Sequence, residues 1–142
     1  MKAKEYLTQL RQMDRMISLE LEKLEYWREM STRIGGCRFE EKHNPNRPAE
    51  APYVKAVEKI AELENRIAKE LEEFVDFKAQ LSDMVRQIPN FDERMVIELR
   101  YIDNLPWDEI ADRCGYTLRW VYKLHGRGLL AFEGVMKEGD VL

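Results

Sequence analysis

Two long stretches of the chain repeat apolar side chains at intervals of three and four residues, the spacing of one helix face. They cover residues 3–32 and 53–88, and the positions between carry Lys, Arg, Glu and Asp of mixed sign. An isolated amphipathic helix is poorly stable in water, so each stripe needs a partner. The pattern therefore predicts a long antiparallel hairpin of two helices, packed like a coiled coil.

The two predicted stripes are defined by their apolar positions. In the first helix these are Tyr6, Leu7, Leu10, Met13, Ile17, Leu21, Leu24, Trp27 and Met30. In the second they are Val57, Ile60, Leu63, Ile67, Leu71, Phe74, Phe77, Leu81, Met84, Val85 and Ile88. The second stripe is wide, and two explanations stay open for Phe74 and Phe77. Either they leave surface for a second copy, giving a homodimer through the hairpin, or they cover the loop or the C-terminal domain.

The segment 33–52 loses this periodicity and is predicted to be a mobile loop. It is punctuated by Gly and Pro, which favour turns over helices: Gly35, Gly36, Pro45, Pro48 and Pro52. Cys37 and His43 lie in it, and Cys114 with His125 lies later in the chain. Neither pair has the close ligand spacing of a structural zinc site, so we expect no metal.

A third helix is expected after Pro89, whose ring cannot continue the second helix. Asn90 can cap it, with Glu93 three residues later as in a capping box. Its apolar face is formed by Phe91, Met95, Val96, Leu99 and Ile102. Asn104 then stands where a residue in the left-handed conformation would turn the chain.

The stretch 107–132 has the pattern of two short helices joined by a three-residue turn. Trp107, Ile110, Ala111 and Cys114 follow helical spacing up to Gly115, which is suited to end a helix. Thr117 is the expected N-cap of a helix over 118–132, whose inward positions are Val121, Leu124, Leu129 and Phe132. The segment 89–137 is therefore predicted to be a three-helix domain with a helix-turn-helix, followed by an acidic, frayed tail at 138–142.

The charges of this stretch favour contact with DNA. Between residues 113 and 132 lie Arg113, Arg119, Lys123 and Arg127, together with His125, and no Asp or Glu. A helix face that meets phosphate must lose its carboxylates, whereas an ordinary solvated face mixes both signs. In DNA-binding helix-turn-helix proteins the second helix enters the major groove.

The residues V-I-E-L-R-Y-I-D-N-L-P-W-D-E-I-A-D-R-C-G-Y-T, followed by a basic helix, resemble region 4 of the sigma-70 family of RNA polymerase sigma factors. This resemblance covers about 91–137. The whole chain, from the opening M-K-A-K-E-Y-L-T-Q-L-R-Q-M-D to V-Y-K-L-H-G-R-G-L, is similar to small phage and prophage proteins of Gram-positive bacteria that carry such a domain behind a helical half. The resemblance implies an all-α fold of sigma-70 region 4 type and, as for some of that group, regulation of late phage transcription.

The residues expected to touch DNA follow from helical position and from this resemblance. Base contacts are carried over to Leu118, Arg119, Tyr122 and Lys123, and phosphate contacts are expected from Thr117, Arg113 and Arg127. Sigma proteins have charged or amide side chains where this chain has Leu118 and Tyr122, so the resemblance does not imply an ordinary −35 promoter element. Trp120 is open to two interpretations, packing or flanking of the DNA.

Composition narrows the remaining function classes. The chain has 142 residues and a net charge of −4, so affinity for DNA would come from a local patch. Phosphate-loop, nucleophile-elbow and zinc-protease motifs are missing, and we expect no enzyme and no cofactor. Two cysteines, no signal-peptide pattern and no apolar run of the roughly 20 residues needed to span a bilayer predict a cytoplasmic protein that does not enter a membrane.

Three functions remain open. The first is a DNA-binding transcriptional regulator, with double-stranded DNA as its partner. The second is a phage assembly or DNA-packaging adaptor, similar to a small terminase subunit. The third is a module that binds RNA polymerase and does not bind DNA alone.

Overall fold

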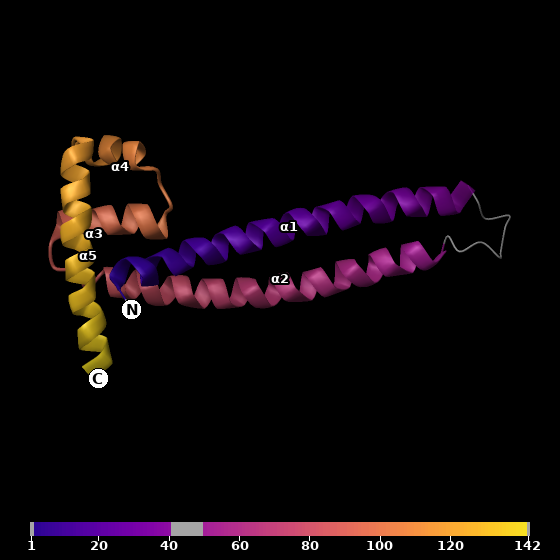
Figure 1. The fold of residues 1–142 in the computed structure, drawn as a ribbon, viewed down its shortest axis with the longest axis horizontal. Helices are drawn as coiled ribbons and strands as arrows, with labels where there is room; N and C mark the ends of the chain where they lie inside the picture. Colours follow the sequence, from indigo (N-terminus) through magenta and orange to yellow (C-terminus); the bar gives the residue numbers. More distant parts are fainter. Residues whose placement is uncertain (1, 41–49, 142) are drawn as a thin grey trace. The chain divides into compact units, whose positions relative to one another are not determined.

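The computed structural model describes residues 2–40 and 50–141, and within these ranges the protein is all-α (Figure 1). The elements are α1 (Ala3–Glu40), α2 (Glu50–Val85), α3 (Phe91–Ile97), the π-helical segment η1 (Glu98–Ile102), α4 (Trp107–Cys114) and α5 (Leu118–Val141). Helices α1 and α2 form the predicted antiparallel hairpin, and the shorter helices follow it. No helix of the described residues is long and apolar enough to cross a membrane.

The chain packs as two compact units. One consists of Met1–Asp14 with Phe74–Leu142, and the other of Arg15–Glu73. The first turns of α1 and the last turns of α2 therefore belong with the C-terminal helices. The packing units therefore do not follow the predicted domain boundary at residue 88, because the first unit includes parts of both hairpin helices. The boundary at residue 88 stays a prediction.

The helix bounds of the hairpin differ from the predicted 3–32 and 53–88, and α2 ends at Val85, three residues before the predicted end. Helix α1 continues past Thr32 to Glu40, and α2 already begins at Glu50. Pro52 is accommodated in the first turn of α2, where its missing N–H would have no helical acceptor in any case. The predicted loop at 33–52 is thus helical at 33–40 and 50–52, a correction to the sequence interpretation. Its remainder, 41–49, lies outside the described residues.

The unit Arg15–Glu73 is held by a small apolar cluster of Leu24, Leu63 and Ile67, with Trp27 and Ile60 packed against it. Two predicted stripe positions of α2 are exposed instead, Val57 and Leu71. In α1 the predicted position Leu21 is also exposed, and its neighbour Glu20 is buried at 5 % exposure. Spacings of three and four from Ile17 to Leu24 pass equally through residue 20 or 21, which is why the pattern did not decide between them.

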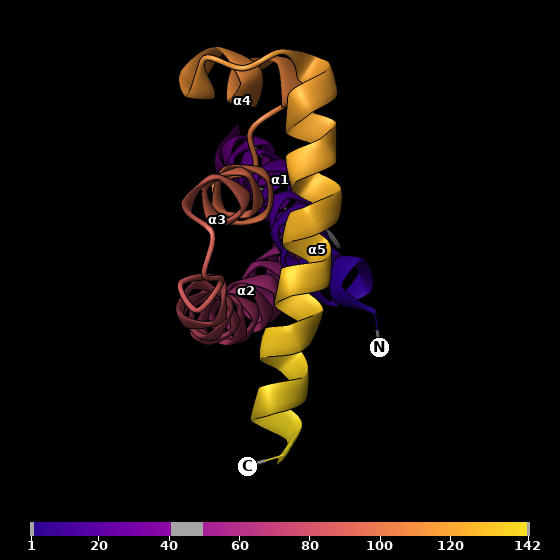
Figure 2. The same cartoon turned by 90° about the vertical axis from the view of Figure 1, so that its left-hand side faces the viewer.

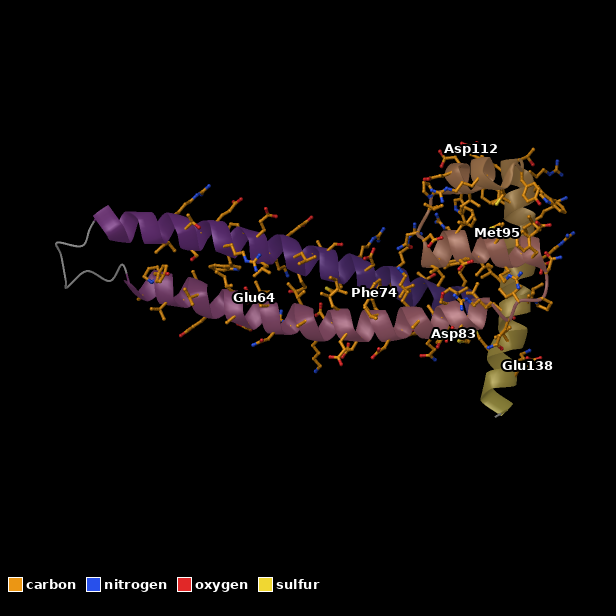
Figure 3. The ribbon with its side chains drawn as sticks, turned by 180° about the vertical axis from the view of Figure 1, so that it is seen from behind. Glu64, Phe74, Asp83, Met95, Asp112 and Glu138 are labelled. Atoms are coloured by element: carbon orange, nitrogen blue, oxygen red, sulfur yellow. The ribbon has the colours of Figure 1, made fainter. Side chains whose placement is uncertain are left out.

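The other unit has two cores. In the first, Leu7 and Leu10 of α1 and Leu81 of α2 are buried together with Tyr101, Ile102 and Phe132. Phe74 and Phe77 pack against this cluster, and Phe77 meets the ring of Tyr6 edge to face at 5.4 Å between centroids. Figure 3 shows Phe74 among the side chains between α2 and α1. Of the two explanations for these rings, the contacts favour covering of the C-terminal domain.

The second core joins α3, α4 and α5, which Figure 2 shows with α3 and α4 both set against α5. Its buried members are Val96, Ile110, Ala111, Val121 and Leu124, all of them predicted as inward positions. Phe91 was also expected to face inward, but it is 59 % exposed, with the Arg94 guanidinium 5.6 Å from its ring. Sequence analysis did not single out Ile97 and Tyr101, which belong to the first core.

Local signals at the ends of these helices are confirmed. Asn90 Oδ1 accepts a hydrogen bond from the Glu93 N–H at 3.0 Å, and Asn104 adopts a left-handed conformation with φ 57°. Helix α5 starts after Thr117 as expected but continues to Val141, so residues 138–141 of the predicted tail are helical. A Cβ at Gly128 would lie 2.6 Å from Ile97 Cγ1, so this glycine lets α5 approach α3 closely.

We predict that Glu20→Leu stabilises the protein by about 1–2 kcal/mol, because burying a carboxylate without a hydrogen-bond donor costs free energy, whereas the half-exposed Arg66 stays solvated when Glu20 is removed. Glu20 Oε2 has no hydrogen-bond donor and lies 3.6 Å from Nη1 of the half-exposed Arg66. Urea unfolding followed by circular dichroism measures the change. Leu21→Gln, at the exposed neighbouring position, is the control and should stay within about 0.5 kcal/mol of wild type. A loss of stability in Glu20→Leu would contradict the prediction.

Candidate nucleic-acid interface

The turn between α4 and α5 is built as its residues predict. Gly115 takes the left-handed conformation with φ 71°, and the N–H of Tyr116 donates to the carbonyl of Ala111 at 3.0 Å. Thr117 Oγ1 accepts from the N–H of Trp120 at 3.2 Å, which caps α5. The Tyr116 hydroxyl donates to Asp92 Oδ1 at 2.8 Å and so ties the turn to α3. Together these bonds fix where α5 begins.

The first half of α5 exposes the side chains that were predicted to read bases. Leu118 is 42 % and Tyr122 50 % exposed, and Arg119 and Lys123 are exposed beside them. Val121 and Leu124 point the other way, into the core of the three helices. Because these positions share one face of the helix, the structure brings all four candidate base contacts together.

The three residues predicted to contact phosphate differ in the partners that their side chains already have. Arg113, on α4, donates to Glu109 Oε1 at 3.2 Å, so part of its charge is already paired. The guanidinium of Arg127 lies 5.3 Å from the ring of Trp120, which keeps 37 % of its surface exposed. Thr117 is exposed, with its hydroxyl used in the cap. Trp120 therefore belongs to the exposed surface of α5 and is not part of its core.

A second group of side chains next to this face was not found from the sequence. The guanidinium of Arg100 lies 4.3 Å from the ring of Trp107 and donates to the carbonyl of Leu105 at 3.1 Å. The same indole meets Tyr122 edge to face at 5.3 Å and His125 at 4.7 Å. Trp107 thus connects Arg100 to the candidate reading residue Tyr122.

The π-helical segment η1 places the members of this group. The N–H of Asp103 donates to the carbonyl of Glu98 at 3.0 Å, five residues back, which widens the last turn. Such wide turns are rare and occur frequently at functional sites. Here Tyr101 is buried and its hydroxyl oxygen lies 2.7 Å from Nε2 of His125. The aromatic residues were visible in the sequence, but nothing local indicated that they meet.

Electrostatics make His125 a neutral member of the interface. Burial, and then the nearby charges of Lys4 and Arg100, lower its pKa from 6.5 to about 4. Burial also raises the pKa of Tyr101, so its hydroxyl stays protonated and can donate to the neutral imidazole. His125 therefore adds no positive charge at pH 7, although the sequence placed it among the basic residues of α5.

The described residues contain no cluster of three or more His, Cys, Asp or Glu side chains that could hold a metal ion. The thiol of Cys114 has a raised pKa because of burial and, after it, Asp92. His43 lies outside the described residues, as does the side chain of Cys37. The exposed side chains of the candidate interface are mainly cationic, aromatic and hydroxyl groups, which are able to contact phosphates and base edges.

We predict that His125→Gln weakens the dependence of stability on pH. Between pH 6.5 and about 4 the unfolded chain binds a proton at His125 and the folded chain does not, so wild-type stability falls as the pH is lowered. The glutamine amide can still bond to Tyr101 but does not titrate. Melting temperatures at pH 7 and pH 4.5 should therefore differ less for the variant than for wild type. Equal differences would show that His125 titrates normally in the folded protein.

Comparisons with protein-family models, with curated proteins and with solved structures find no match to this chain.

Proposed function

We propose that this chain is a sequence-specific DNA-binding regulator of transcription, of the sigma-70 region-4-like type found in phages and prophages. In this proposal α5 enters the major groove over residues 118–132, and the hairpin serves association with another protein chain. The observation that carries it is the exposed face of α5, where Arg119, Lys123 and Arg127 stand with no carboxylate between residues 113 and 132. Such a face repels other cations and attracts phosphate.

The side chains on that face also suit base recognition. Arg119 can donate two parallel hydrogen bonds to guanine, while Leu118 and the ring of Tyr122 can contact a thymine methyl group. Thr117 and Arg127 stand at the two ends of this row, where phosphate contacts would fix the register of the helix. Tyr122 is held by Trp107 and is therefore ordered before any DNA binds, which lowers the entropic cost of recognition.

The experiment that tests this function is selection of bound sequences from a random DNA pool at about 150 mM salt, where non-specific phosphate binding is weakened. We expect one motif, or two half-sites if the protein is a dimer. Recovery of no motif would overturn the proposal. Ring-shaped oligomers on sizing would then favour the packaging adaptor, and capture of RNA polymerase without DNA would favour the polymerase-binding module.

We further propose that the hairpin carries a homodimer contact along α2. Val57, Ala61, Ala68 and Leu71 are exposed and lie four, seven and three residues apart, which places them on one face of α2 beside the seam that packs on α1. A second apolar line of this kind is expected where a helix packs against two neighbours. Sedimentation velocity at micromolar concentration should show a dimer, and a monomer alone would overturn this contact.

We predict that Arg119→Ala weakens binding to the selected DNA by about 1–3 kcal/mol and relaxes the base preference at one position. Arg86→Ala removes an exposed arginine just beyond the end of α2 and is the matched control. Fluorescence anisotropy with the selected duplex measures both. Equal affinities for wild type and Arg119→Ala would remove Arg119 from the reading residues.

A further inference from the structure

The N-terminal turns of α1 bring two more cations to the side of the helix-turn-helix. Lys4, Thr8 and Arg11 occupy positions i, i+4 and i+7, which form one line along a helix. Ala3, Leu7 and Leu10, each one residue before a member of this line, are buried with Tyr101 and Ile102 of η1 and Phe132 of α5. The line therefore runs along the edge of the contact between α1 and the C-terminal helices.

Arg100 lies between the first turns of α1 and the reading face of α5, which is the exposed face that carries Leu118, Arg119, Tyr122 and Lys123. Its guanidinium lies over the ring of Trp107, and Tyr122 meets the same indole edge to face. Arg100 precedes Tyr101, which is buried in the same cluster as Ala3, Leu7 and Leu10, so the first turns of α1 lie beside this group. In line with this packing, Arg11 lowers the pKa of Arg100, after desolvation, and Lys4 lowers the pKa of His125, after burial. A chain of contacts thus leads from Tyr122 of α5 to Trp107 and from Trp107 to Arg100, which lies beside the first turns of α1.

These cations have no carboxylate partner in the described part of the chain. Among the described residues no ion pair involves Lys4, Arg11 or Arg100, and no carboxylate contributes to the pKa shifts of Arg100 or His125. Like charges held together cost stability unless an outside anion compensates them. The arrangement therefore favours an anionic partner next to the reading face of α5.

We propose that Lys4, Arg11 and Arg100 form a basic ridge that binds the phosphates of double-stranded DNA beside the contact made by α5. This rests on the proposed function, since it extends the same interface. Residues seven apart on a helix are separated by about 10 Å, so Lys4 and Arg11 can each meet a different phosphate. Double-stranded DNA is preferred over an acidic protein because Arg100 is joined through Trp107 to Tyr122, on a helix that has no carboxylate between residues 118 and 132.

The test compares two double variants of the full chain. Lys4→Gln with Arg11→Gln removes the ridge charges of α1, and Lys23→Gln with Arg33→Gln removes an exposed lysine and arginine further along the same helix. Binding to the selected duplex and to a random-sequence duplex is measured between 50 and 200 mM salt. The slope of log affinity against log salt is negative, and each lost phosphate contact reduces its magnitude by about 0.9.

We expect the ridge variant to bind both duplexes about tenfold or more weakly, to lose about 1.8 from the salt slope, and to keep its base preference. Arg11→Lys, which keeps the charge, should retain the wild-type slope. The control pair should bind like wild type. All four positions are exposed or partly exposed, so we expect each variant to fold. Thermal melting of each variant checks this.

Three results would overturn the ridge, and they differ in what they leave standing. Wild-type affinity and slope in the ridge variant would remove the ridge but leave DNA binding by α5 intact. Equal weakening in both double variants would show a general effect of charge with no local ridge. Failure of the wild-type protein to bind either duplex would overturn the proposed function together with the ridge.

Discussion

The burial of the first turns of α1 against the C-terminal helices is the contact on which the rest of this unit depends. Leu7 and Leu10 meet Ile97, Tyr101 and Phe132, which are separated from them by most of the chain. Removing such side chains from water provides the main free energy that holds helices together. Without this contact, η1 and the C-terminal half of α5 would each expose an apolar face to water.

The same contact sets the electrostatics of the interface. It buries Tyr101, and it brings Lys4 near His125, whose pKa is lowered by its own burial and then by the charges of Lys4 and Arg100. It also leaves Arg100 above Trp107, beside the exposed face of α5. A chain with a net charge of −4 can in this way present a local positive surface, and the salt dependence of binding would report that surface and not the whole molecule.

Features that depend on neighbouring residues could be predicted from the sequence. The cap at Asn90, the left-handed residues Asn104 and Gly115 and the cap at Thr117 are all determined by side chains within four positions. For the same reason the four exposed candidate reading residues of α5 share one face as expected. The choice between Glu20 and Leu21 could not be predicted, because it depends on how α2 lies against α1.

The cluster around Trp107 could not be predicted for a related reason. Arg100, Tyr101, Trp107 and His125 come from three elements, and only the wide turn of η1 and the packing of α5 bring them together. At Gly35, Gly36 and Pro52 the sequence interpretation gave too much weight to single residues and predicted a loop where the structure has helix. Glycine in a helix costs only about 1 kcal/mol, and proline costs little in a first turn, so these residues did not end the helices where the sequence suggested.

Amide NMR spectra recorded while the selected duplex is added to the protein test most directly whether the exposed face of α5 meets DNA. We predict that the largest shifts fall on residues 117–127, with smaller ones on Lys4 to Arg11, and that residues 15–73 change little. Shifts confined to the hairpin, or none at saturating DNA, would contradict it.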